Sequence, residues 1–509
     1  MHIRRFAYGL TAVAVLGADR LASGDCEVTE LLPPSHLTGS VAIDGDVILT
    51  GAWTADGISN FTGAAFVFRY EGGTWEFEAK LQAPDGEFDD RFGWSVAISG
   101  DVAVVGSRDD EHEGFDVGSA YVYRFDGSGW IQEVKLIPPD GEFLDRFGVS
   151  SAIRGDVLVV GAYLDDDGGD RSGSAYVYRY NGSDWKLETK LVASDGAEGD
   201  EFGHSLAIED NVIVVGARHF FNGGAGAAYI FRFNGQEWSE EAKLESSDGQ
   251  DLDFFGDDVG ISGNNVIVGA HGNDEAANHA GAAYIFSFDG KVWGDEQKVF
   301  ALAPAHNDRF GESVAINGDL AIGGSVGDDP TGSITVFRLV NGNWIWTDRI
   351  EASDGSVGDQ FSRAGIVLQN DVAVVSATHH HHGDSIGTAY VFAGLKLIDC
   401  DGNGVANSCQ IADGSSQDCN SNFVPDACDI ADGTSKDAND NGIPDECESP
   451  ECPWDVNGDG IVDHHDLVEV VHNMGMCDDP DDCPWDVNGD GIVNGRDVAA
   501  VAMHFGPCP

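Results

Sequence analysis

Two acidic segments near the C-terminus have the residue types and the spacing of a calcium-binding loop. Residues 455–466 and 486–497 carry oxygen-bearing side chains at positions 1, 3, 5, 9 and 12 and a glycine at position 6. Calcium takes about 6–8 oxygen ligands, and such a loop, with its position-7 carbonyl, can surround one ion. We therefore predict two calcium sites, formed by Asp455, Asn457, Asp459, Ile461, Asp463 and Asp466 and by Asp486, Asn488, Asp490, Ile492, Asn494 and Asp497.

Each of the two loops leads into a segment with the periodicity of an amphipathic helix. Apolar side chains recur at helical spacing, at Leu467, Val470, Val471 and Met474 after the first loop and at Val498, Val501, Ala502 and Phe505 after the second. The two loop–helix units, over residues 452–508, resemble a type I dockerin, the module that attaches secreted enzymes to cohesin-bearing scaffolds. The resemblance implies a cohesin-like partner, although loop positions 10 and 11 hold His464-His465 and Gly495-Arg496 where cellulosomal dockerins have small hydroxyl residues. We expect residues 449–509 to form a small α-helical, dockerin-like calcium-binding domain.

Three shorter acidic segments with a 19-residue period precede this domain. They resemble thrombospondin type 3 repeats, in which short calcium loops replace a hydrophobic core. The resemblance implies further calcium sites over residues 398–448, and the alternative is a disordered acidic linker. The expected ligands are Asp399, Asp401, Asn403 and Asn407, then Asp418, Asn420, Asn422, Asp426 and Asp429, then Asp437, Asn439, Asn441, Ile443, Asp445 and Glu448.

Nine of the ten cysteines lie beyond residue 399. Small domains with a thin core depend on disulfides or metal ions for stability. The spacing from Cys452 to Cys477 equals that from Cys483 to Cys508, so we expect one disulfide within each loop–helix unit, with a crossed arrangement as the alternative. Five cysteines then remain in the preceding segment, an odd number, and one of them could pair with Cys26.

Upstream of the acidic segments, one sequence pattern recurs seven times with a period of about 55 residues. The copies align on Leu37-Thr38, Phe92-Gly93, Phe147-Gly148, Phe202-Gly203, Phe255-Gly256, Phe310-Gly311 and Phe361-Ser362. Each copy contains four short runs rich in β-branched and aromatic residues, separated by Gly/Asp turns. This period is too long for a helical solenoid and suits a four-stranded propeller blade. We therefore predict an all-β, seven-bladed β-propeller over residues 24–397.

The seventh copy lacks its fourth strand. Residues 27–34 resemble residues 132–139, which form the fourth strand of an earlier copy, so we expect the N-terminal segment to complete the last blade and close the ring. The seven copies resemble the FG-GAP repeat family, which forms the propeller of integrin α subunits and of many secreted bacterial proteins. The resemblance extends over roughly residues 25 to 397.

One position within the repeat differs in every copy. The residue two after the phenylalanine is Gly39, Trp94, Val149, His204, Asp257, Glu312 and Arg363 in turn. We interpret these residues as a variable ring near the mouth of the central channel, free either to recognise a ligand or to drift. The candidate ligand-binding side chains are Trp94, His204, Asp257, Glu312 and Arg363.

Two other features of the repeats are interpreted as structural. An aspartate recurs two residues before the phenylalanine in six copies, and this recurrence indicates a hydrogen-bond acceptor that braces a loop. Residues 379–382 are four consecutive histidines, which could hold a transition metal; we favour an unpaired loop tract without fixed geometry.

The composition and the N-terminal segment indicate an exported protein that does not bind nucleic acid. The net charge of −61 repels nucleic acid and anionic lipid. Residues 1–23 have two arginines, an apolar run and a small-residue end, the pattern of a secretory signal peptide. No other stretch is apolar over the length of a transmembrane anchor. We expect a secreted protein, free or associated with the cell surface.

The sequence contains no His-Glu-x-x-His helix, phosphate loop or dinucleotide fingerprint. We therefore expect a calcium-binding, non-enzymatic adhesion protein. Its propeller loops would bind a glycan or protein, and its tail would dock or space the propeller. One alternative is an accessory or glycoside-active component of a dockerin-organised, polysaccharide-degrading complex. A second is a structural extracellular matrix protein.

Overall fold

The computed structural model of the 509-residue chain divides into two compact units, residues 1–415 and 416–509. The expected domain boundaries, at residues 24, 398 and 449, remain predictions. The described residues are 26–31, 39–58, 61–112, 115–220, 224–328, 331–382, 385–393, 395, 416–417, 419, 426–432, 435–437, 444, 461–462, 464–476, 492–503 and 506–507.

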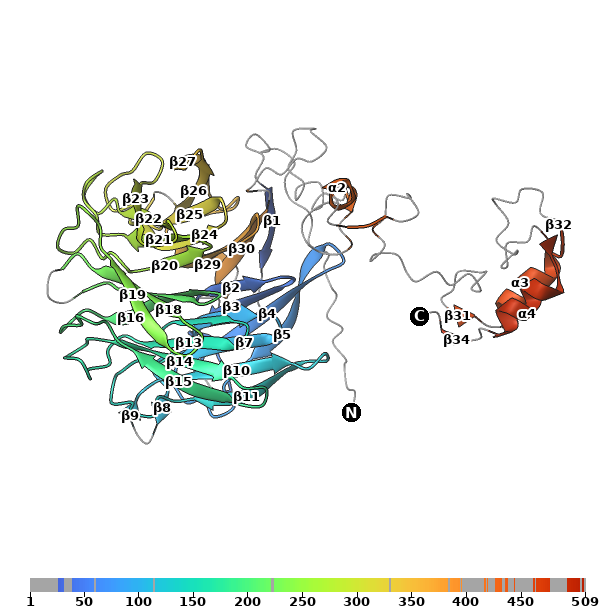
Figure 1. The fold of residues 1–509 in the computed structure, drawn as a ribbon, viewed down its shortest axis with the longest axis horizontal. Coiled ribbons are helices and arrows are strands. Elements are labelled where there is room, and N and C mark those ends of the chain that lie inside the picture. The colour runs from blue at the N-terminus through green and yellow to red at the C-terminus, as the bar shows by residue number, and fades with distance from the viewer. Residues whose placement is uncertain are drawn as a thin grey trace, which may run out of the picture. The chain divides into compact units, whose positions relative to one another are not determined.

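The first unit is a ring of seven four-stranded antiparallel sheets (Figure 1). The first three blades are β2 (Val41–Asp44), β3 (Val47–Ala52), β4 (Ala64–Glu71) and β5 (Thr74–Leu81), then β6 (Phe92–Ser99), β7 (Val102–Ser107), β10 (Ser119–Phe125) and β11 (Trp130–Leu136), then β12 (Ser151–Arg154), β13 (Val157–Ala162), β14 (Ser174–Tyr180) and β15 (Trp185–Leu191). A small hairpin, β8 (Glu111–His112) and β9 (Phe115–Asp116), lies between β7 and β10.

The next three blades repeat this order. They are β16 (Phe202–Glu209), β17 (Val212–Ala217), β18 (Ala227–Phe233) and β19 (Trp238–Leu244), then β20 (Val259–Ser262), β21 (Asn265–Ala270), β22 (Ala282–Phe288) and β23 (Trp293–Val299), then β24 (Phe310–Asn317), β25 (Leu320–Ser325), β26 (Ser333–Val340) and β27 (Asn343–Ile350). The first strand of each blade contacts the first strands of both neighbouring blades, so these strands form the innermost layer of the ring. The prediction of a seven-bladed, all-β propeller is confirmed.

The seventh blade joins the two ends of the propeller. Strands β28 (Phe361–Gln369), β29 (Val372–His382) and β30 (Ser385–Ala393) are completed by β1 (Cys26–Leu31), which pairs antiparallel with β30 (Figure 1). The Leu31 side chain is buried, and its carbonyl accepts a hydrogen bond of 2.8 Å from Thr388 Oγ1. The predicted closure by the N-terminal strand is therefore confirmed.

The recurrent Phe-Gly pair explains how neighbouring blades pack so closely. Phe147 is fully buried, and its ring lies 5.4 Å from the Tyr176 ring, centroid to centroid. Its backbone bridges to Gly118 of the preceding blade. Gly148 has a φ of +89°, and a Cβ placed there would lie only 2.2 Å from the Ser119 carbonyl oxygen. Only glycine combines this backbone conformation with such an approach.

Serine hydroxyls connect the innermost strands of consecutive blades. The Oγ atoms of Ser95, Ser150 and Ser205 donate to the carbonyls of Gly148, Gly203 and Gly256, at 2.9, 2.7 and 3.0 Å. The fifth blade has Asp258 at this position, and its Oδ2 accepts from the backbone amide of Val314 at 2.8 Å. Burial raises the pKa of Asp258 to about 7, with a further contribution from the adjacent Asp257 carboxylate.

The described residues of the second unit form three helices: α2 (Asp426–Asp432), α3 (His464–His472) and α4 (Gly495–Met503). Helices α3 and α4 follow the two predicted calcium loops and contact each other, with Val470 and Val501 fully buried. Strand β31 (Ile461–Val462) pairs with β34 (Gly506–Pro507), and β32 (Gly475–Met476) pairs with β33 (Ile492–Val493). The two loop–helix units are thus joined by two short antiparallel strand pairs. Among the described residues, no helix has both the length and the apolar character needed to cross a bilayer.

Replacing Gly148 by alanine is expected to destabilise the propeller well beyond the cost of a positive φ. The matched control is Gly155→Ala, because Gly155 also has a positive φ (+58°) but no atom lies within 4 Å of the position that an added Cβ would take. The control should lower the free energy of unfolding by about 1 kcal/mol. Gly148→Ala should lower it at least twice as much, because the new Cβ collides with backbone. Urea unfolding monitored by fluorescence measures both. Equal costs would contradict the proposed inter-blade constraint.

Replacing Asp258 by serine is expected to stabilise the protein more at pH 8 than at pH 5. An aspartate has a pKa of about 3.9 when unfolded, whereas Asp258 has a folded-state pKa of about 7. The folded state therefore binds more protons between these values, so the contribution of Asp258 to stability is fully present below about pH 4 and is lost as the pH rises to about 7. Thermal unfolding across this pH range tests the difference. The exposed Asp251→Ser is the control, and a pH-independent effect of Asp258→Ser would refute the argument.

Candidate functional site

A central cavity of about 1400 Å³ is lined by the innermost strands of all seven blades. Small and apolar side chains of these strands, such as Ala97 and Ile98, form part of the wall. One end of the cavity is lined instead by residues that differ from blade to blade. We call these residues the mouth: Trp53, Trp94, Arg108, Tyr163, His204, Arg218, Asp257, Glu312 and Arg363.

Two columns of the repeat supply the mouth. The first is the predicted variable position, and the structure places Trp94, His204, Asp257, Glu312 and Arg363 all in the cavity lining. The second column is the residue that directly follows the second strand of a blade. Because Phe92 pairs with Ser107 in the antiparallel β6–β7 pair, the start of the first strand and the end of the second lie at the same end of the channel.

The second column was missed by the sequence analysis. It contributes Trp53, Arg108, Tyr163 and Arg218 to the mouth. The signal was present in the sequence, because a near-constant strand ending in Gly-Ala or Gly-Ser is followed by Trp53, Arg108, Tyr163, Arg218 and His271 in the first five copies. The register that brings the two columns together became visible only in the structure.

Aromatic side chains gather on the first three blades. The Trp53 and Trp94 rings lie 5.2 Å apart, centroid to centroid, with their planes inclined by 46°. The Arg108 guanidinium lies over the Trp94 ring at 3.2 Å from its centroid. Further round, the Tyr163 ring meets the His204 ring edge to face at 5.6 Å.

Three arginines of the second and third blades share one carboxylate next to these rings. Asp109 forms ion pairs with Arg91 at 2.9 Å, with Arg108 at 3.4 Å and with Arg146. Arg91 also pairs with the exposed Asp89 at 3.2 Å. Burial lowers the pKa of Arg108 to about 9, and the adjacent Arg91 and Arg146 guanidinium groups act in the same direction.

The fourth and fifth blades contribute a compensated acidic cluster. The buried Asp257 accepts an ion pair of 3.2 Å from Arg218 and lies 2.9 Å from His271 Nδ1. Arg218 also pairs with Glu201 at 2.7 Å. Burial disfavours the charge on Asp257, but the His271, His204 and Arg218 side chains prevail and lower its pKa. Burial and the Arg218 charge together lower the pKa of His204 to about 3, so His204 is neutral at pH 7.

Glu312 of the sixth blade differs from Asp257 in its ionisation. Its carboxylate lies 3.3 Å from Arg309. Burial raises the pKa of Glu312, with only partial compensation from Arg309. Arg363 of the seventh blade is exposed and donates a hydrogen bond to the Gln360 side chain.

The aspartates that recur before the phenylalanine are hydrogen-bond acceptors, as predicted. In each case the Oδ2 atom accepts from the backbone amide three residues earlier, for example from Glu142 to Asp145 at 2.6 Å. The same contact occurs at Asp90, Asp200, Asp253, Asp308 and Asp359. These aspartates therefore brace the loop that precedes each blade.

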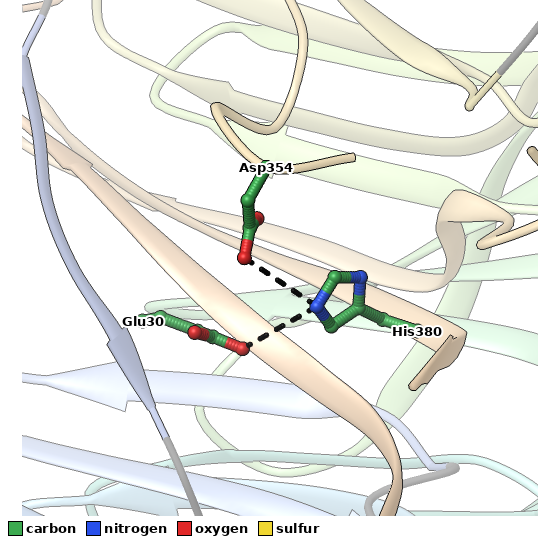
Figure 2. A group of neighbouring side chains, drawn as sticks. All are labelled: Glu30, Asp354 and His380. Atoms are coloured by element: carbon green, nitrogen blue, oxygen red, sulfur yellow. Dashed lines mark ion pairs between the residues drawn. The ribbon is translucent and has the colours of Figure 1, made fainter. Parts of the chain in front are cut away.

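The histidine run at residues 379–382 lies within strand β29, so the expectation of an unpaired loop tract is wrong. His381 and His382 pair with the start of β30, which fixes the backbone of this segment. The His380 side chain is buried. Its Nε2 atom lies 3.5 Å from Asp354 and 3.8 Å from Glu30 (Figure 2). Its Nδ1 atom lies 2.7 Å from Asp359.

The closing blade reverses the polarity found in other blades. In the second blade, Lys135 of the outer strand lies 2.9 Å from Asp110. In the closing blade, Glu30 stands at the register position of that lysine, and its carboxylate lies 3.8 Å from His380 Nε2. One atom each of Glu30, Asp354 and His380 lies within 4.8 Å of the others, which is also a donor set for a divalent metal.

The structure describes part of the predicted calcium-binding residues: Asp426, Asp429, Asp437, Ile461, Asp466, Ile492, Asn494 and Asp497. Asp466 and Asp497, at position 12 of the two loops, are completely buried. Asp497 Oδ2 accepts a hydrogen bond of 2.8 Å from the backbone amide of Asn494. Buried carboxylates are normally paired or bound to metal, so these residues fit a calcium site.

The other predicted ligands lie outside the described residues. They are Asp399, Asp401, Asn403, Asn407, Asp418, Asn420, Asn422, Asn439, Asn441, Ile443, Asp445, Glu448, Asp455, Asn457, Asp459, Asp463, Asp486, Asn488 and Asp490. The predicted disulfides of Cys452, Cys477, Cys483 and Cys508 also lie outside them. Cys419 and Cys428 are each disulfide-bonded.

No curated protein matches this chain. A family model described as the FG-GAP repeat matches residues 75–123, 130–178, 185–231, 238–286, 293–337 and 344–392, which together make up more than half of the chain. Each match runs from the fourth strand of one blade to the third strand of the next and so includes the interface between the two blades. The chain therefore belongs to the FG-GAP repeat family.

Proposed function

We propose that this protein is a secreted, non-enzymatic binding protein whose propeller holds an extracellular saccharide at the mouth of its central cavity. The FG-GAP propeller fold points to a binding or adhesion domain. The observation that carries the proposal is the gathering of blade-specific aromatic and charged side chains around one cavity, while the neighbouring repeat positions stay nearly constant. Pockets of this kind bind ligands through apolar surfaces and a few placed polar groups.

The paired tryptophans favour a saccharide over a protein as the ligand. Trp53 and Trp94 both line the cavity, 5.2 Å apart. An indole offers a rigid apolar face that accepts the C–H face of a sugar ring, and the adjacent Arg108 provides donors for ring hydroxyls. A cavity enclosed by seven blades admits an oligosaccharide more readily than a folded domain.

A second candidate function is glycoside hydrolysis, and one observation favours it. Asp257 and Glu312 line the same cavity on neighbouring blades, and their surroundings shift the two pKa values in opposite directions. This separation is typical of an acid–base pair in a glycosidase. Asp257, however, is buried and held by Arg218 and His271, so it is better placed to support the mouth than to attack a substrate. We therefore favour binding without catalysis.

We further infer that the C-terminal domain binds calcium and docks or spaces the propeller, and that residues 1–23 direct export. Support for calcium comes from the complete burial of Asp466 and Asp497 at the last ligand position of two matching loops. The exposed His464-His465 pair at loop positions 10 and 11 implies a docking partner different from that of cellulosomal dockerins. A matrix protein without a specific ligand would share the calcium sites but not the saccharide site.

Replacing Trp94 by alanine is expected to weaken saccharide binding at least tenfold, because it removes one stacking surface, and aromatic contacts of this kind contribute about 0.5–1.5 kcal/mol beyond the buried area. A glycan array identifies a bound oligosaccharide, and calorimetry compares the variants. The control is Trp346→Ala, since Trp346 is exposed on the outer strand β27 and is not part of the lining. Unchanged affinity of Trp94→Ala, or release of shorter saccharides by the wild type, would contradict the proposal.

In the full-length protein, the double substitution Asp466→Asn and Asp497→Asn is expected to lower the calcium affinity of two sites tenfold or more, or to abolish calcium binding there. Each change removes a negative ligand from a buried position. Calorimetric titration of chelator-treated protein with calcium gives the number of sites and their affinities. Glu469→Gln, at an exposed position on α3, is the control for the loss of one negative charge. Identical titrations of the double variant and the wild type would rule out calcium at these residues.

A further inference from the structure

We propose that the saccharide bound at the mouth is acidic, with carboxylate or sulfate groups held by the arginines of the second and seventh blades. This inference rests on the proposed saccharide-binding function and narrows it to one chemical class. It follows from the distribution of charge around the mouth, the degree to which each charge is compensated, and the position of the tryptophans.

The cavity lining has more basic than acidic side chains, whereas the chain as a whole is strongly acidic. The whole protein has a net charge of −61. Among the described residues that line the cavity, however, four are arginines (Arg108, Arg218, Arg309 and Arg363) and three are acids (Asp257, Asp258 and Glu312). Burial raises the pKa of Asp258 to about 7, which lowers its average negative charge at neutral pH, and burial also raises the pKa of Glu312. The lining is therefore cationic within an anionic protein.

The acidic half of the mouth is compensated within itself. Asp257 binds Arg218, at 3.2 Å, and also His271. Glu312 lies 3.3 Å from Arg309. Arg218 also pairs with Glu201 at 2.7 Å, so these blades hold no cation in excess.

The opposite half, on the seventh, first and second blades, has cations in excess. Together with Arg146 of the third blade, Arg91 and Arg108 share the carboxylate of Asp109, and among the described residues only the exposed Asp89 is paired with this group in addition. Arg363 lines the cavity, is exposed, and has no carboxylate within ion-pair distance among the described residues. Guanidinium groups bind carboxylate and sulfate oxygens through paired, charge-assisted hydrogen bonds. An anionic ligand would therefore balance the excess positive charge of this half.

The tryptophans lie between these cations in the order of the blades. The first blade lies between the seventh and second blades, because β2 contacts both β28 and β6. It contributes Trp53 to the mouth. A sugar ring on the tryptophans would thus have Arg108 on one side and Arg363 on the other. A stacked ring with an acidic substituent matches this arrangement.

The test compares three trisaccharides that differ only in their acidic groups: galacturonic acid, neutral galactose and 6-O-sulfated galactose, all in the same linkage. Calorimetry with full-length, calcium-loaded protein measures each affinity. We expect at least one acidic trisaccharide to bind tenfold or more tightly than the neutral one, because hydrogen bonds to charged groups contribute about 1.5–3 kcal/mol. The preferred acidic form distinguishes carboxylate from sulfate recognition. The preference should fall as sodium chloride is raised.

Arg363→Gln provides the matched variant, since it removes the charge of an exposed side chain that takes part in no ion pair among the described residues. It should lower the affinity for the acidic trisaccharide about tenfold and leave that for the neutral one unchanged. Arg154→Gln, at an exposed position on β12 outside the lining, is the control. Equal affinity for neutral and acidic forms, or no effect of Arg363→Gln, would overturn the inference while the saccharide-binding function stands. Binding of no saccharide, on the trisaccharides or on an array, would overturn both.

Discussion

Adjacent blades approach so closely at the Phe-Gly step that backbone contacts backbone, and the other features of the propeller depend on this contact. The missing side chain at Gly148 allows the carbonyl of Ser119 to come within a distance that a Cβ would block. The buried Phe147 ring then packs against the tyrosine of its own blade. The Phe-Gly pair is kept in five of the seven copies, so the approach of neighbouring blades is nearly constant around the ring. Variation is confined to side chains that leave the interface, and these form the mouth.

Most of the fold could be predicted from the sequence because the constraint repeats. A period of about 55 residues, the turn residues and the displaced fourth strand are all local patterns, and together they specify the number of blades and the closure by β1. The histidine run was predicted wrongly for a related reason. Four consecutive polar residues indicate a loop, but β29 continues through them because β30 offers a partner strand.

Only half of the candidate site could be predicted from the sequence. Trp94 and Arg363 were found because their column varies between constant neighbours, whereas Trp53 and Arg108 require the strand register to be placed beside them. The pairing of charges at the site is even harder to predict from the sequence than the register of the strands. The sequence shows Asp257 and Arg218 in separate repeats, and only their 3.2 Å contact reveals that the acid is paired, whereas Arg363 forms no ion pair among the described residues. The charge balance of a site is a property of distances, which a list of residues does not contain.

The acidic exterior and the cationic lining act together on any charged ligand. At physiological ionic strength, electrostatic interactions are screened over about 8 Å, so a molecule outside the protein meets mainly the negative surface. An extended polyanion is therefore repelled along most of its length. A short acidic segment that reaches Arg108 and Arg363 meets the opposite field within a partly desolvated cavity, where charge-assisted hydrogen bonds are stronger. The contrast between the two surfaces thus favours ligands whose acidic groups are few and can enter the mouth.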